Sequence, residues 1–96
     1  MAKPSTEELN NAMDIFMGNI QKLNNTIYLN RTFLSQRQTT FDDTKFLLDL
    51  FELIAHSRFS DAYHKIQFMR EYLIKYIPKP ILYFLNEKGK EDAWGD

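Results

Sequence analysis

A regular alternation of apolar residues, spaced four and three positions apart, runs through the N-terminal third of the chain. The residues that carry it are Leu9, Met13, Phe16, Ile20, Leu23, Ile27 and Leu34, and Asn30 interrupts it. A helix with this spacing has a narrow apolar seam along one side, as coiled-coil helices and helices packed on a single neighbour do. The pattern predicts a helix from residue 6 to about residue 36, with its seam facing either the domain's own core or another chain.

The start of this helix is marked by a capping signal. Ser5 and Glu8 have the spacing of a capping box, and Glu7 adds a second negative charge at the positive end of the helix. Residues that make sharp turns are scarce, with three glycines and three prolines among 96 residues. Long helices are therefore favoured over a sheet of many strands.

Two further segments have helical periodicity. Residues 42–56 carry eight apolar side chains, so this helix should be central in the domain or expose a second apolar face. In residues 60–77 the four-three spacing recurs at Ala62, Ile66, Met69, Leu73 and Tyr76. The first segment is acidic and the second is basic, and residues 57–59 form a short connector. We expect an antiparallel hairpin here, preceded by a loop at residues 37–40.

Proline and glycine define the C-terminal part. Pro78 and Pro80 should end the preceding helix, and Pro80 suits the first turn of a short helix over residues 81–87. Gly89 would cap that helix. The sequence thus predicts a single all-α domain over residues 1–96, with a long N-terminal helix, an antiparallel helical hairpin and a short C-terminal helix. Residues 1–5 and 89–96 are expected to be mobile.

The composition excludes several kinds of chemistry. The chain has no cysteine, which rules out disulfides, thiolate metal sites and cysteine nucleophiles. His64 follows Asp61 by three residues and His56 lies near the turn, but their spacing matches no metal or catalytic signature. We expect no enzymatic activity, no cofactor and no metal site. No apolar run approaches the roughly 18 residues of a membrane span, and the N-terminus lacks a signal-peptide pattern, so a cytoplasmic protein is expected.

Residues 46–78 resemble a single tetratricopeptide hairpin. Residues 58–62 (Arg-Phe-Ser-Asp-Ala) are similar to that family's aromatic-then-alanine entry into its second helix, and Pro78 resembles the proline that closes the unit. The segment departs from the family at Leu50 and Met69, which are bulky where the family has small residues. The resemblance implies a helical hairpin in a peptide- or helix-binding adaptor, as in small helical export chaperones.

These observations favour a non-enzymatic protein-interaction module: an adaptor, chaperone or assembly factor that binds a partner helix, or a second copy of the chain in a homodimer, through the apolar seam. The predicted partner-binding residues are Met13, Phe16, Ile20, Leu23 and Ile27. A net charge of −1 argues against a general nucleic-acid binder. The alternative is a small DNA-binding regulator that uses the basic helix 60–77, with Lys65, Arg70 and Lys75 contacting phosphates.

Overall fold

The computed structural model describes the backbone of residues 4–29 and 34–94, and the side chains of residues 4–25 and 42–89. Its elements are α1 (Thr6–Leu29), α2 (Leu34–Ala55), α3 (Phe59–Gln67), the 3-10 helix η1 (Glu71–Tyr76) and α4 (Lys79–Trp94). The described residues contain no strand, and the predicted all-α class is confirmed.

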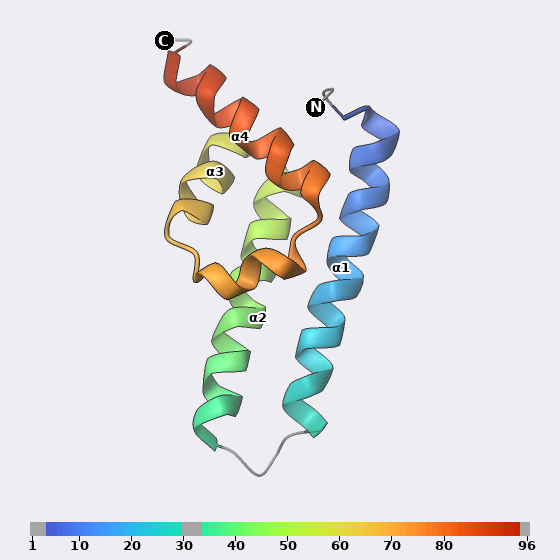
Figure 1. Cartoon of the computed structure of the whole chain (residues 1–96), viewed down its shortest axis with the longest axis vertical. Helices are drawn as coiled ribbons and strands as arrows, with labels where there is room; N and C mark the ends of the chain where they lie inside the picture. The colour runs from blue at the N-terminus through green and yellow to red at the C-terminus, as the bar shows by residue number, and fades with distance from the viewer. Residues whose placement is uncertain (1–3, 30–33, 95–96) are drawn as a thin grey trace.

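The helices α1 and α2 form an antiparallel pair along the long axis, and α3, η1 and α4 pack on one half of it (Figure 1). The molecule is elongated, with principal extents of 48 × 26 × 23 Å. The helix α2 contacts both α1 and α3. Its Leu47 and Leu50 side chains are buried in the core, whereas Leu48 is 37% exposed and Phe51 and Ile54 are only partly buried. The apolar residues of α2 therefore form a buried face and a second, partly exposed apolar face, which is one of the two outcomes that the sequence predicted.

The middle of the α1 seam, from Phe16 to Leu23, faces the chain's own core. Phe16 is fully buried, and Ile20 and Leu23 are 3% and 9% exposed. The ring of Phe16 lies against that of Phe51 on α2, with 5.9 Å between centroids. Phe16, Ile20 and Leu23 are therefore not on the surface where a partner would meet them, because the neighbouring helices already cover them. The side chain of Ile27, also predicted to bind a partner, lies outside the described residues.

The predicted start of α1 is confirmed. The amide of Glu8 donates a hydrogen bond to Ser5 Oγ at 3.1 Å, and Ser5 Oγ donates to Glu8 Oε1 at 3.3 Å. Both contacts involve residues three positions apart, and so the sequence alone could specify them.

The predicted end of the first helix is wrong. The helix α1 ends at Leu29 rather than near residue 36, and α2 already begins at Leu34. Residues 37–40, predicted as a loop, lie inside α2. They include no glycine or proline, so nothing in their chemistry prevents a helix, and polar composition alone was a weak loop signal. Asn30 lies outside the described residues.

The predicted helix 60–77 is interrupted. The helix α3 ends at Gln67, Arg70 is extended (φ −66°, ψ 129°), and η1 follows. After this break, Leu73 and Ile77 both enter the core, at 1% and 3% exposure. The Asn19 side chain on α1 donates a hydrogen bond to the Tyr76 carbonyl at 2.9 Å, which fixes the end of η1. Long-range packing has thus overridden the local periodicity.

The helix α4 extends beyond its predicted range of 81–87. It continues to Trp94, so residues 89–94 are helical, and Gly89 lies inside the helix instead of capping it. Gly89 is buried against the ring of Tyr63 on α3. A Cβ atom at this position would lie 2.2 Å from Tyr63 Cγ. Glycine therefore allows α3 and α4 to approach each other closely here.

Candidate functional site

A groove is open to solvent between α1, α2 and α4, and we call it the α1–α2–α4 groove. It encloses about 480 Å³. Its apolar walls are made mainly by Leu9, Met13, Phe51, Ile54, Phe59 and Phe84. Thr6, Asn10 and Ser57 add polar groups, and none of the described lining residues is charged. Met13 is the predicted partner-binding residue that the structure places in this groove; its side chain is half-buried.

Helical spacing explains how α1 contributes side chains both to the core and to the groove. Its core face is formed by Ala12, Phe16, Ile20 and Leu23. Its groove residues, Thr6, Leu9, Asn10 and Met13, follow the i, i+3, i+4, i+7 pattern of an adjacent stripe. On α2, Phe51, Ile54 and Ala55 are spaced in the same way. The groove is therefore formed by two helix faces that lie next to the faces buried in the core.

The turn after α2 closes one end of the groove. Ser57 has a positive φ of 59°, the amide of Ser57 donates to the Ile54 carbonyl at 3.0 Å, and the amide of Arg58 donates to the Leu53 carbonyl at 2.8 Å. This is the hydrogen-bond pattern of a Schellman motif. The turn brings Phe59 against Phe84 of α4 in an edge-to-face contact, with 4.8 Å between centroids. Aromatic packing thus fixes this wall of the groove before any partner binds.

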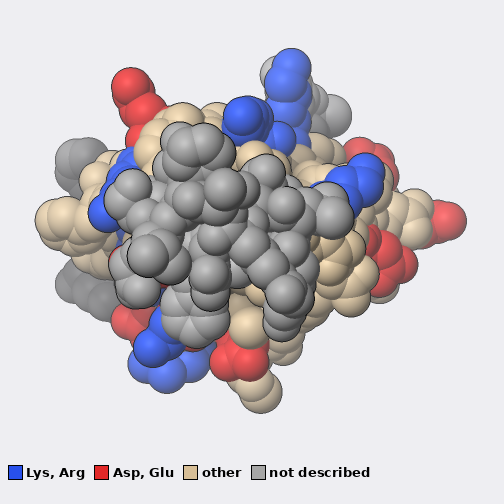
Figure 2. Space-filling model, turned by 90° about the horizontal axis from the view of Figure 1, so that it is seen from below, with Lys and Arg blue, Asp and Glu red and all other residues tan. Residues whose placement is uncertain are grey.

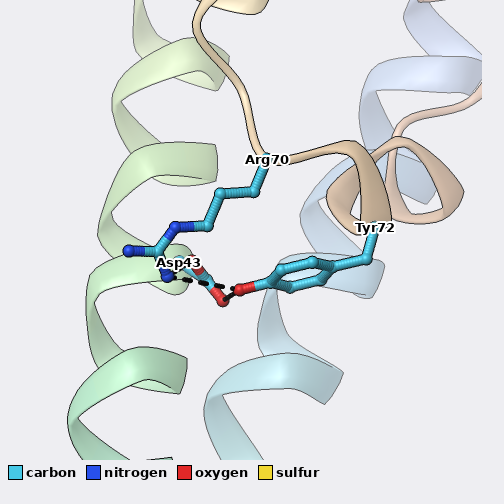
Figure 3. Close-up of polar contacts among 3 residues, drawn as sticks. All are labelled: Asp43, Arg70 and Tyr72. Carbon is cyan, nitrogen blue, oxygen red and sulfur yellow. Dashed lines mark hydrogen bonds and ion pairs between the residues drawn. The ribbon is translucent and has the colours of Figure 1, made fainter.

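A polar cluster joins η1 to α2 on another part of the surface (Figure 3). Asp43 on α2 is 5% exposed and accepts hydrogen bonds from the Tyr72 hydroxyl and from Arg70 Nη1, the latter at 3.3 Å. Arg70 Nη1 also donates to the Tyr72 hydroxyl at 3.3 Å. A buried carboxylate requires such partners, since desolvation without them is costly. The cluster holds the interrupted segment 68–76 against α2, which is a structural role.

Sequence reasoning missed this cluster, although one signal was present. Asp43 precedes the core residues Leu47 and Leu50 by four and seven positions, so it lies on the buried stripe of α2. A charged residue on such a stripe predicts a buried polar partner. That partner, Tyr72, is 29 residues away, and helical periodicity carries no information about such a pairing.

Replacing Tyr72 with phenylalanine is expected to destabilise the fold by about 1–3 kcal/mol, because the buried Asp43 carboxylate loses a donor. The hydrogen bond to Asp43 and burial also raise the pKa of Tyr72 above its ordinary value of 10.0. The folded state thus holds this proton more tightly than the unfolded state. The associated stability is complete below pH 10 and is lost as the pH rises through the higher folded pKa.

The measurement is urea denaturation between about pH 8 and pH 12, the range in which tyrosine titrates. The original protein should lose stability more steeply above pH 10 than the Tyr72→Phe variant does. Tyr63→Phe is the matched control, since the Tyr63 hydroxyl forms no hydrogen bond with a described residue. Equal slopes for the original protein and Tyr72→Phe would show that the Tyr72–Asp43 hydrogen bond does not form in solution.

Asp61 and His64, which are three residues apart, do not pair with each other. Asp61 Oδ2 lies 2.6 Å from Arg58 Nη2, and His64 Nδ1 lies 2.7 Å from the Ser60 carbonyl oxygen. Within the described ranges, no group of three or more acidic or histidine side chains could hold a metal ion. Among the helices described, none is both long enough and apolar enough to cross a membrane.

The basic residues of segment 60–77 do not share one helix face. Lys65 Nζ lies 4.3 Å from the centroid of the Phe46 ring, while Arg70 belongs to the cluster with Asp43. The helix α3 has only nine residues. Seen along the long axis, acidic and basic side chains are interspersed around the molecule (Figure 2). A recognition helix with a continuous basic face is therefore absent from the described part of this segment.

A smaller apolar surface surrounds the break after α3. Phe68 is 85% exposed, and Tyr72 and Ile74 are about half exposed. Phe68, Phe46 and Leu73 border a pocket of about 150 Å³ beside Asp43. Most of the Phe68 side chain is in solvent, and the pocket beside it is about a third the size of the α1–α2–α4 groove, so the groove is the stronger candidate site.

Comparison with protein-family models, curated proteins and solved structures finds no match. Function is therefore inferred from the groove, its walls and the charges around it.

Proposed function

We propose that this chain is a non-enzymatic protein-interaction module, of the adaptor, chaperone or assembly-factor kind, that receives an apolar helical segment of a partner protein in the α1–α2–α4 groove. The observation that carries the proposal is the groove itself. Three helices form it, its walls are apolar, and its volume of about 480 Å³ is in the range of binding pockets. Helix-in-groove recognition places the apolar face of a partner helix in such a depression.

The large surface of the chain supports the proposal. Its accessible surface is 6753 Å², whereas a compact monomeric protein of 11.5 kDa has about 5,800 Å². The elongated pair of α1 and α2 exposes more area than a compact domain of this mass does. The resemblance of residues 46–78 to a tetratricopeptide hairpin suggests the same class of function.

The proposal can be tested by photocrosslinking in the cells that express the protein. A benzophenone amino acid at Asn10, an exposed groove residue, should give a discrete crosslinked protein adduct. The same probe at Gln21 is the matched control, because Gln21 lies eleven residues along the same side of α1 but outside the groove. Ala55→Trp should abolish the Asn10 adduct, since an indole at this exposed lining position fills the groove.

Two outcomes would contradict the proposed function. One is an identical adduct pattern from the probes at Asn10 and Gln21. The other is an Asn10 adduct that persists in the Ala55→Trp background while circular dichroism shows that the variant is folded.

A further inference from the structure

Acidic residues lie next to the lining of the α1–α2–α4 groove on two of its three helices, and we call them its rim. On α1, Glu7 precedes the groove residue Asn10 by three positions and Asp14 follows it by four, so all three share one face. On α2, Glu52 precedes the groove residue Ala55 by three positions. Glu7, Asp14 and Glu52 are all exposed. Carboxylates on α1 and α2 therefore lie beside an uncharged apolar groove, and Glu52 also lines a neighbouring pocket with Arg58.

These charges are not neutralised within the described part of the chain. None of the three carboxylates forms an ion pair with a described residue. Arg58 follows the groove residue Ser57, but it is paired with Asp61 at 2.6 Å. On α4, Lys88 follows the groove residue Phe84 by four positions, and its Nζ lies 5.9 Å from the centroid of the Phe84 ring. The α1 and α2 sides of the rim therefore keep a negative potential.

We infer that the groove is built for a cationic amphipathic helix, with an apolar face for the groove and lysine or arginine on both flanks of that face. This inference rests on the proposed function and specifies its partner. Apolar burial would supply most of the affinity, and opposite charges along the rim would orient the helix and speed its approach. A helix with acidic flanks would meet like charges on α1 and α2, and this repulsion would select against it.

A second copy of the chain is the competing occupant. Its exposed residues Phe68, Tyr72 and Ile74 lie beside Arg70 and Lys75 and could reach a groove of another molecule. The contact would join two different surfaces of the molecule. It would therefore produce open-ended oligomers that grow with protein concentration rather than a closed dimer.

The test uses three designed peptides of about 18 residues, or five helical turns. All three share one leucine face, and their flanking positions are lysine, glutamine or glutamate. By fluorescence anisotropy, the lysine peptide should bind about tenfold more tightly than the glutamine peptide, which is the effect of three exposed ion pairs of ordinary strength. The glutamate peptide should bind most weakly, and added salt should reduce these differences.

Two variants locate the effect. The triple variant Glu7→Gln, Asp14→Asn, Glu52→Gln should reduce the preference for lysine to about twofold or less, and Ala55→Trp should remove binding of all three peptides. The control variant Asp42→Asn, Asp49→Asn, Glu71→Gln removes the same charge away from the groove lining, leaves the Arg58–Asp61 ion pair in place and should keep the preference.

Failure of this inference can be distinguished from failure of the proposed function. If the lysine and glutamine peptides bind equally well and Ala55→Trp blocks both, the inference of a cationic partner is wrong. The proposed function, a groove that binds a helix, would still stand. Binding of no peptide would also overturn it, and the photocrosslinking result would then decide the proposed function independently. Sedimentation experiments would show whether the chain self-associates. Self-association that is abolished by Ala55→Trp would overturn the inference of a cationic partner helix, because a second copy of the chain would then occupy the groove.

Discussion

Replacing Phe16 with alanine is expected to destabilise the fold by about 3–5 kcal/mol. Phe16 is fully buried at the centre of the α1 seam and packs against Phe51. Truncation removes the transfer energy of the ring and leaves a cavity between α1 and α2. Since the free energy of unfolding of a small domain is only about 5–15 kcal/mol, this one change should remove much of it. Chemical denaturation followed by circular dichroism measures it.

The neighbouring residue provides the control. Ile15 is 57% exposed, so Ile15→Ala should change stability by no more than about 0.5 kcal/mol. If Phe16→Ala were as mild as Ile15→Ala, the seam would not lie in the chain's own core. If the seam faced a partner instead, Phe16→Ala would weaken association with that partner rather than the stability of the fold.

Replacing Gly89 with alanine is expected to destabilise the fold by about 1–3 kcal/mol, against the usual preference of helices for alanine. The new Cβ would lie 2.2 Å from Tyr63 Cγ and 2.4 Å from Tyr63 Cδ1. Because Cγ is the first ring atom, the clash is not relieved by a small tilt of the ring; Tyr63 must change its χ1 rotamer and lose its packing, or α3 must move away from α4. The free energy of unfolding, from urea denaturation, is the quantity to compare.

The control for Gly89 is the other glycine inside a described helix. A Cβ at Gly18 on α1 meets nothing within 4 Å, so Gly18→Ala should stabilise the protein by about 0.5–1 kcal/mol. In a Tyr63→Ala background, where the clashing ring is absent, Gly89→Ala should cost less stability than it does in the original protein. Stabilisation by Gly89→Ala of the same size as that by Gly18→Ala would mean that α3 and α4 do not approach as closely as described.

Local signals predicted local structure well. The pair Ser5 and Glu8 gave the start of α1, and the four-three spacing gave a helix with one buried side. The break after Gln67 could not be predicted, because its cause is the burial of Leu73 and Ile77 against helices distant in sequence. The extent of α4 was missed for a similar reason. Gly89 was interpreted as a cap from residue type alone, whereas its neighbour Tyr63 is 26 residues away.

The candidate site was predictable only in part. Met13 was identified because it belongs to the seam, but apolar spacing cannot separate the stripe that enters the core from the stripe beside it. Thr6 and Asn10 interrupt the groove stripe with polar side chains, which hides it from an apolar pattern. The groove also requires Phe84 from α4, and the sequence does not say where that helix crosses α1 and α2.

The central claim is that a partner helix binds the α1–α2–α4 groove while Phe16, Ile20 and Leu23 of the α1 seam stay in the core. Methyl NMR of isoleucine-labelled protein, titrated with the lysine peptide, tests it most directly. The methyl signals of Ile54, in the groove, should shift, while those of Ile74, which is 44% exposed on η1, should not. Shifts at Ile74 with Ile54 unchanged would contradict the claim and place binding on the surface around Phe68.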